Sequence, residues 1–80
     1  MSHLNTLGSL YKSVSIELTD AKVDRPELEA RILLAHAARI EHTRVIGYPE
    51  DKLNSITIGN LRKIVERRKR GEPIAHIIGM

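Results

Sequence analysis

The run Leu28-Glu29-Ala30-Arg31-Ile32-Leu33-Leu34-Ala35-His36 sets the fold class of this chain. On a helix of 3.6 residues per turn, its apolar side chains point in nearly every direction rather than along one stripe. A helix of that kind is covered on all sides, so it belongs at the centre of a bundle. We expect it over about residues 25–39, with Asp24 as its N-cap and Glu27 completing a capping box.

The segments on either side predict helices that surround this central one. Apolar residues recur there at steps of three and four, which lines one face of each helix. Helices are expected over about residues 3–19, around Val45 and Ile46, over about 56–70 with Ser55 or Thr57 as the cap, and over 73–78, with a loop at 51–55 whose Leu53 turns inward. No segment sustains an alternation of period two, so no strand is expected. The predicted fold is all-α, one domain over residues 1–80 in a compact bundle of four to five helices, with the second helix central.

The composition excludes several classes of protein. Eighty residues are enough for one small domain, and its core must come from 23 Leu, Ile and Val residues because Phe and Trp are absent. The chain has no cysteine, which excludes disulfides, thiol nucleophiles and zinc fingers and fits a reducing cytoplasm. No apolar run approaches the roughly 20 residues of a membrane span, and the N-terminus lacks a secretory signal. These features predict a soluble cytoplasmic domain.

The end of the fourth predicted helix is marked by a change in chemistry. Four cations at Arg67, Arg68, Lys69 and Arg70 complement the negative end of the helix dipole, and Gly71 then ends the helix. Pro73 suits the first turn of the next helix, which is apolar to the last residue. Because no polar tail follows, we expect the natural chain to continue past Met80.

The same stretch carries a resemblance to a known family. Arg67-Arg68 followed by Gly71-Glu72-Pro73-Ile74-Ala75-His76 resembles the signature near the interdomain linker of the HemK/PrmC family. Pro26 and the run 28–36 resemble the second helix of that family, at a fitting separation. Members methylate the glutamine of the Gly-Gly-Gln motif in peptide-chain release factors, with S-adenosylmethionine as the methyl donor. The resemblance extends from about Leu4 to Gly79 and matches only the small N-terminal helical domain of the family.

The resemblance implies a recognition domain that is not catalytic alone. The family's catalytic domain uses a glycine-rich S-adenosylmethionine loop and an Asn-Pro-Pro-Tyr motif. This sequence contains no Asn-Pro pair, and its five glycines occur singly. We therefore expect no catalytic, cofactor-binding or metal-binding residue here. The implied partners are a release factor and the methyltransferase domain of the parent enzyme, with S-adenosylmethionine bound by that domain.

A basic face on the fourth predicted helix is the candidate surface for a partner. It consists of Arg62, Lys63, Arg67, Lys69 and Arg70, with Glu66 as the single acid among them. Such a face attracts an acidic protein or RNA, although charges on an exposed helix also occur simply as a solvated surface. A net charge of +3 and two aromatic residues argue against nucleic acid. A small nucleic-acid-binding domain and a free-standing helical adaptor remain the alternatives.

Two further sets of residues are singled out by their positions. Arg68 and Glu29 both fall on apolar faces of their helices, which predicts a semi-buried ion pair; the alternative is an Arg68 that extends to water alone. Ile74, Ile77 and Ile78 either cap the open end of the bundle or form a contact with the domain that follows.

Overall fold

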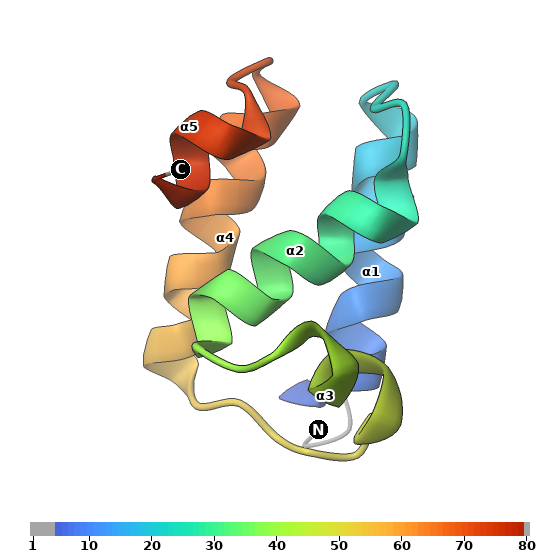
Figure 1. Ribbon diagram of the computed structural model, residues 1–80, viewed down its shortest axis with the longest axis vertical. Coiled ribbons are helices and arrows are strands. Elements are labelled where there is room, and N and C mark those ends of the chain that lie inside the picture. The colour runs from blue at the N-terminus through green and yellow to red at the C-terminus, as the bar shows by residue number, and fades with distance from the viewer. Residues whose placement is uncertain (1–4, 80) are drawn as a thin grey trace.

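The computed structural model describes residues 5–79, in which five helices are joined by short connections (Figure 1). The helices are α1 (Leu7–Asp20), α2 (Pro26–Ala38), α3 (His42–Gly47), α4 (Ser55–Lys69) and α5 (Ile74–Ile78). Between residues 5 and 79 there is no strand, only an isolated bridge between Thr6 and Lys52. The predicted all-α class is confirmed. None of the helices described is long and apolar enough to cross a membrane.

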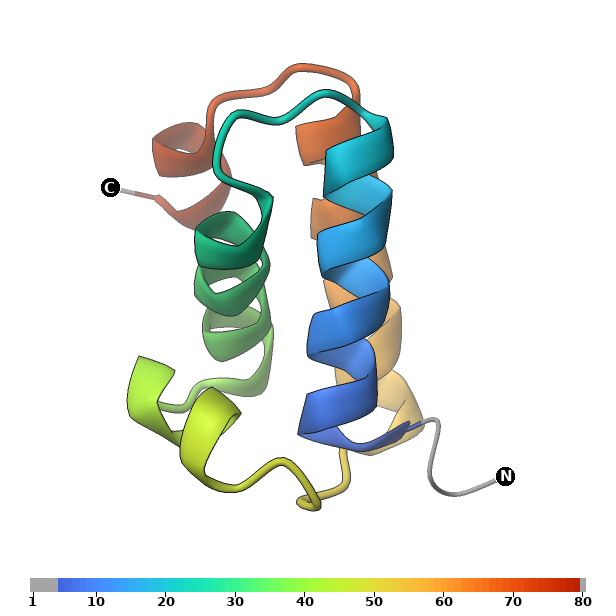
Figure 2. The ribbon, with the colours of Figure 1, turned by 90° about the vertical axis from the view of Figure 1, so that its right-hand side faces the viewer.

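The helix α2 occupies the centre of the bundle, as its sequence predicts. It packs against each of the other four helices. In Figure 1 it crosses in front of α1 and α4, while α3 lies at one end of the bundle and α5 at the other. The same arrangement is visible after a quarter turn in Figure 2. Four residues of α2 are buried: Ala30, Leu33, Leu34 and Ala35.

The core is aliphatic and draws on all five helices. The largest fully buried side chains are Leu7, Val14, Leu18, Leu33, Leu34, Val45, Leu61 and Val65. Each such side chain stabilises the fold by about 1.5–3 kcal/mol relative to remaining in water. The loop residue Leu53 packs against this cluster, so the expectation that it turns inward is confirmed.

The start of α1 differs from the prediction. We expected the helix to begin near residue 3, but Asn5 and Thr6 precede it; residues 3 and 4 lie outside the described residues. Thr6 has an extended backbone, and its side-chain oxygen accepts a hydrogen bond from the backbone N–H of Ser9 at 3.2 Å. A capping threonine of this kind fixes where a helix begins, and apolar spacing alone does not reveal it.

The predicted caps of α2 and α4 are also wrong. The N-cap of α2 is Arg25 rather than Asp24, and no side chain caps this helix. Pro26 opens α2 without an N–H, which leaves one donor fewer to satisfy at the helix start. The N-cap of α4 is Asn54, whose Oδ1 accepts a hydrogen bond from the N–H of Thr57 at 2.8 Å.

Candidate functional site

Most of the basic face on α4 is neutralised by acids of the same chain. Arg62 donates two hydrogen bonds to the carboxylate of Glu17 on α1, at 2.7 and 2.8 Å, and a third to Glu66 at 3.1 Å. Lys69 lies 3.2 Å from Glu17 and 3.3 Å from Glu66. These four side chains form a charge network that ties α1 to α4.

This network changes the acidity of its members. The hydrogen bond from Arg62 lowers the pKa of Glu17, burial opposes that shift, and the hydrogen bond from Lys69 lowers the pKa further. The same pairing with Glu17 raises the pKa of Arg62 and of Lys69. Glu17 is therefore held in its charged form, and its role here is to join two helices.

The other three cations divide between a pair and open solvent. Arg67 pairs with Glu72, which lies just beyond the end of α4, and this hydrogen bond lowers the pKa of Glu72. Lys63 and Arg70 make no ion pair with any residue between 5 and 79, and both are exposed. A partner that approaches α4 therefore meets these two as its available charges.

The structure places Glu29 and Arg68 in direct contact. Arg68 Nε donates to Glu29 Oε1 at 2.5 Å, and the Arg68 guanidinium also donates to the backbone oxygen of Glu72 at 3.4 Å. The hydrogen bond with Glu29 raises the pKa of Arg68. The pair links α2 to α4 inside the bundle and is not available to a partner.

The three isoleucines of α5 have different surroundings. Ile77 is only 7% exposed and belongs to the core, so it is not available as a contact for another domain. Ile74 and Ile78 are half-buried and pack partly against the same core. The α5 helix thus closes one end of the bundle, and a contact with a following domain stays a prediction for Ile74 and Ile78 alone.

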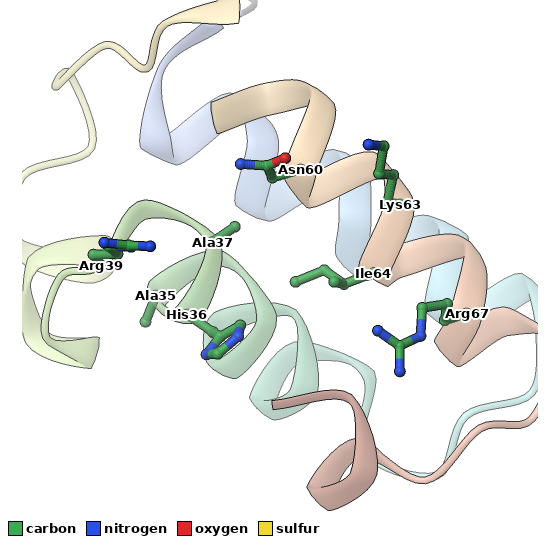
Figure 3. A pocket seen from close by; sticks show the side chains of 8 residues that line it. All are labelled: Ala35, His36, Ala37, Arg39, Asn60, Lys63, Ile64 and Arg67. Carbon is green, nitrogen blue, oxygen red and sulfur yellow. The ribbon is translucent and has the colours of Figure 1, made fainter. Parts of the chain in front are cut away.

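A groove with a volume of about 590 Å³ lies between the C-terminal part of α2 and the middle of α4 (Figure 3). Its lining consists of Ala35, His36, Ala37, Arg39, Asn60, Lys63, Ile64 and Arg67. Figure 3 shows Ile64 projecting from α4 toward α2, with Arg39 and Arg67 at opposite ends of the groove. No carboxylate is among the described residues that line it. The groove is therefore apolar at its floor and basic at its edges.

Arg39 is the member of this groove that the sequence does not reveal. It follows α2 with φ 57°, a left-handed conformation that glycine or asparagine usually supplies at the end of a helix. Its backbone N–H bonds to the carbonyl of His36 at 3.3 Å, and that of Ile40 bonds to the carbonyl of Ala35 at 3.0 Å, which closes the helix. Nothing in the local sequence marks this turn, and only the packing of α2 on α4 brings Arg39 into the lining of the same groove as Lys63.

The described residues do not fit S-adenosylmethionine. A nucleotide-like cofactor needs closely spaced glycines for a tight backbone approach and a carboxylate for its ribose hydroxyls. Gly8 lies against Pro49 in a packing contact, and the other four glycines line no cradle. The groove offers no carboxylate. No chemical step is therefore assigned to these residues.

Residues 9–79 match the family described as PrmC N-terminal domain. The chain belongs to this family. The resemblance seen in the sequence is thereby confirmed, and the helical bundle with its groove is the form that this PrmC N-terminal domain takes here.

Relatives in several bacteria are similar to this chain. It is 36% identical over 74 residues to a release factor glutamine methyltransferase of Caulobacter vibrioides, which covers 92% of this chain and 26% of the relative. It is 32% identical to one of Aliivibrio fischeri, with the same coverage. It is 44% identical over 57 residues to a bifunctional methyltransferase of Rickettsia bellii, over 71% of this chain and 10% of the relative. No solved structure matches significantly. The chain spans about a quarter or less of the length of these relatives.

Proposed function

We propose that this chain is the release-factor-recognition domain of a protein-glutamine methyltransferase. The parent enzyme transfers a methyl group from S-adenosylmethionine to the glutamine of the Gly-Gly-Gln motif in a peptide-chain release factor. This domain is not catalytic alone and works beside a separate methyltransferase domain in the cytoplasm. The observation that carries the proposal is the match of residues 9–79 to the PrmC N-terminal domain, joined to relatives named release factor glutamine methyltransferase.

The physical task of such a domain is to supply binding energy away from the chemistry. A methyltransferase that acts on one glutamine of a large protein must hold that protein while the side chain enters the active site. The exposed cations Lys63 on α4 and Arg70 at its C-cap suit this task, because opposite charge on a partner raises the rate of association. The internally paired Arg62 and Lys69 contribute to the bundle instead.

The test is a direct binding measurement between the purified 80-residue chain and a release factor from the same organism. We expect saturable binding with one site, weakened by the double change Lys63→Ser and Arg70→Ser. The control is Lys12→Ser with Lys52→Ser, which removes the same charge from exposed positions on other elements. Absence of binding by the unaltered chain would overturn the proposal.

A second measurement asks whether the contact matters for methylation. The 80-residue chain is added in excess to a reaction of the full-length enzyme with its release factor. If the chain occupies the recognition surface of the release factor, methylation slows as the chain concentration rises, and more release factor restores it. If the methylation rate is unchanged at chain concentrations where binding is measured, the chain binds the release factor at a surface that the enzyme does not use during catalysis.

A further inference from the structure

We infer that the groove between α2 and α4 holds a segment of the release factor in which a carboxylate accompanies an apolar side chain, and that Arg39 binds the carboxylate. This inference rests on the proposed function and says where on the domain the release factor binds. It extends the contact surface from the exposed side of α4, through Lys63, to the junction of α4 with the end of α2.

The lining of the groove sets the chemistry of its occupant. Ala35, Ala37 and Ile64 offer an apolar surface to one aliphatic or aromatic side chain of a partner. Arg39 and Lys63 stand at its edges, and neither makes an ion pair with a residue between 5 and 79. A carboxylate that enters therefore meets positive charge without repulsion from an acid in the lining.

Arg39 has a backbone conformation that favours glycine, as Lys22 does, but of the two only Arg39 lines the groove. A left-handed conformation costs a residue with a side chain roughly 1–2 kcal/mol, whereas glycine adopts it freely. The side chain of Arg39 is exposed and contributes no buried contact to the core. Its guanidinium offers a planar fork of donors that matches a carboxylate in two parallel hydrogen bonds. The fold does not need the Arg39 side chain, so its guanidinium is available to a carboxylate at the edge of the groove.

A nucleic acid fits the same surroundings less well. Single strands stack their bases chiefly on Phe, Tyr and Trp side chains, and none of these lines this groove, where His36 is the aromatic ring present. A phosphate chain that continued across α4 would also approach Glu17 and Glu66, which pair with Arg62 and Lys69. A short acidic segment of a protein avoids both difficulties.

The decisive variant is Arg39→Gly, and the chain supplies a matched control. Lys22 has the same left-handed backbone, with φ 67° against 57° for Arg39, and it is also exposed and cationic. It lies in the turn before α2 and does not line the groove, so Lys22→Gly removes one charge and relieves one strained residue without touching the site. Both variants are compared with the unaltered 80-residue chain for melting temperature and for the Kd of the release factor.

We expect Arg39→Gly to weaken release-factor binding about tenfold or more, which corresponds to about 1.4 kcal/mol. Lys22→Gly should keep the Kd within about twofold, in line with a distant exposed charge. Both variants should melt at or above the temperature of the unaltered chain, because glycine relieves the backbone. A further variant, Ala37→Gln, fills the floor of the groove and should also weaken binding while the helix content is unchanged.

The possible failures can be told apart. Equal release-factor binding by the unaltered chain and by Arg39→Gly would overturn the assignment of the groove as the binding site, while the proposed function would stand. Absence of release-factor binding by the unaltered chain would overturn both. Tight binding of a single-stranded RNA that depends on Arg39 and falls steeply with salt would replace the protein segment with nucleic acid.

Discussion

Glu29 on α2 and Arg68 on α4 form an ion pair across the bundle, with 2.5 Å between Oε1 and Nε, although 39 positions separate them in the chain. Their side chains are only 15% and 20% exposed. Charges withdrawn from water to this degree depend on one another, because either one alone would remain poorly solvated. The pair therefore fixes how α4 lies against the central helix.

Removing one partner of this pair should destabilise the fold. Loss of a fully buried partner costs about 3–5 kcal/mol, and the partial exposure here reduces the expected cost of Glu29→Ala to about 1–3 kcal/mol. In a chain of this size each kcal/mol lowers the melting temperature by about 4–8 °C. Urea and thermal unfolding at pH 7 measure both quantities.

The control for this prediction is the more exposed pair on the same helix. Arg67→Ala removes a guanidinium that is 42% exposed and bonded to Glu72, so its effect on unfolding should be much smaller than that of Glu29→Ala. A double-mutant cycle with Arg68→Ala isolates the coupling of the buried pair. If Glu29→Ala has the same melting temperature as the unaltered chain, the ion pair with Arg68 does not stabilise the fold and does not hold α4 in place.

The network around Glu17 predicts how stability depends on pH. The pKa of Glu17 is lowered in the folded chain, chiefly by the hydrogen bond from Arg62. A lowered pKa means that the folded state favours the charged form, so this stabilisation is complete above the ordinary pKa of 4.5 and is lost as the pH falls through the lowered folded value. Glu17→Gln should therefore be less stable than the unaltered chain at pH 7, and the two should converge in acid.

Urea unfolding across this range, from neutral pH down to about pH 3, is the measurement. The matched control is Glu50→Gln, which changes an exposed acid outside the helices that makes no ion pair within the described residues. Its stability should follow that of the unaltered chain at every pH. A constant gap between Glu17→Gln and the unaltered chain from pH 7 to pH 3 would contradict the role of the Glu17 charge.

The pattern of apolar residues predicts most of the fold, because burial of one helix face is a strong and periodic constraint. It predicts the centres of all five helices, the central place of α2 and the facing positions of Glu29 and Arg68. It does not predict where the helices begin. Thr6 and Asn54 compete with neighbouring polar residues for the cap, and the winner depends on backbone angles that the pattern does not contain.

The candidate site is harder to predict for a related reason. On a single helix the basic face contains Glu66 as its one acid, but folding adds Glu17 from α1 and Glu72 from the turn after α4. Folding likewise adds Arg39 to the groove from a turn without a sequence signature. Contacts between residues distant in sequence thus decide which charges remain available, and helix periodicity carries no information about them.

The backbone of Gly8 lies close to Pro49 in the loop after α3. Its N–H donates to the carbonyl of Pro49 at 2.9 Å, and a Cβ at this position would lie 2.9 Å from the Cβ of Pro49. Gly8→Ala should therefore destabilise the chain, because crowding of about 1–3 kcal/mol outweighs the gain of about 1 kcal/mol in helix propensity. Thermal unfolding measures the net effect.

Gly59 provides the opposite case within the same molecule. It lies in α4 and is exposed, and a methyl group added to it would have no neighbouring atom within 4 Å. Gly59→Ala should therefore stabilise the chain by about 0.5–1 kcal/mol, because alanine has less backbone freedom to lose on folding. A gain in stability from Gly8→Ala, by contrast, would show that the loop at Pro49 yields to the added methyl group.

The last prediction concerns the cap of α4. Asn54 Oδ1 accepts a hydrogen bond from the backbone N–H of Thr57 at 2.8 Å and satisfies one donor at the helix start. Asn54→Ala should cost about 1 kcal/mol, whereas Asp24→Ala should be nearly neutral because no side chain caps α2. Ser55→Ala, at the first residue of α4, should also change little. Urea unfolding of the three variants measures these changes in the free energy of unfolding. A larger loss of stability from Asp24→Ala than from Asn54→Ala would contradict the caps assigned here. Asp24 would then carry the capping hydrogen bond of α2 that the sequence pattern predicts.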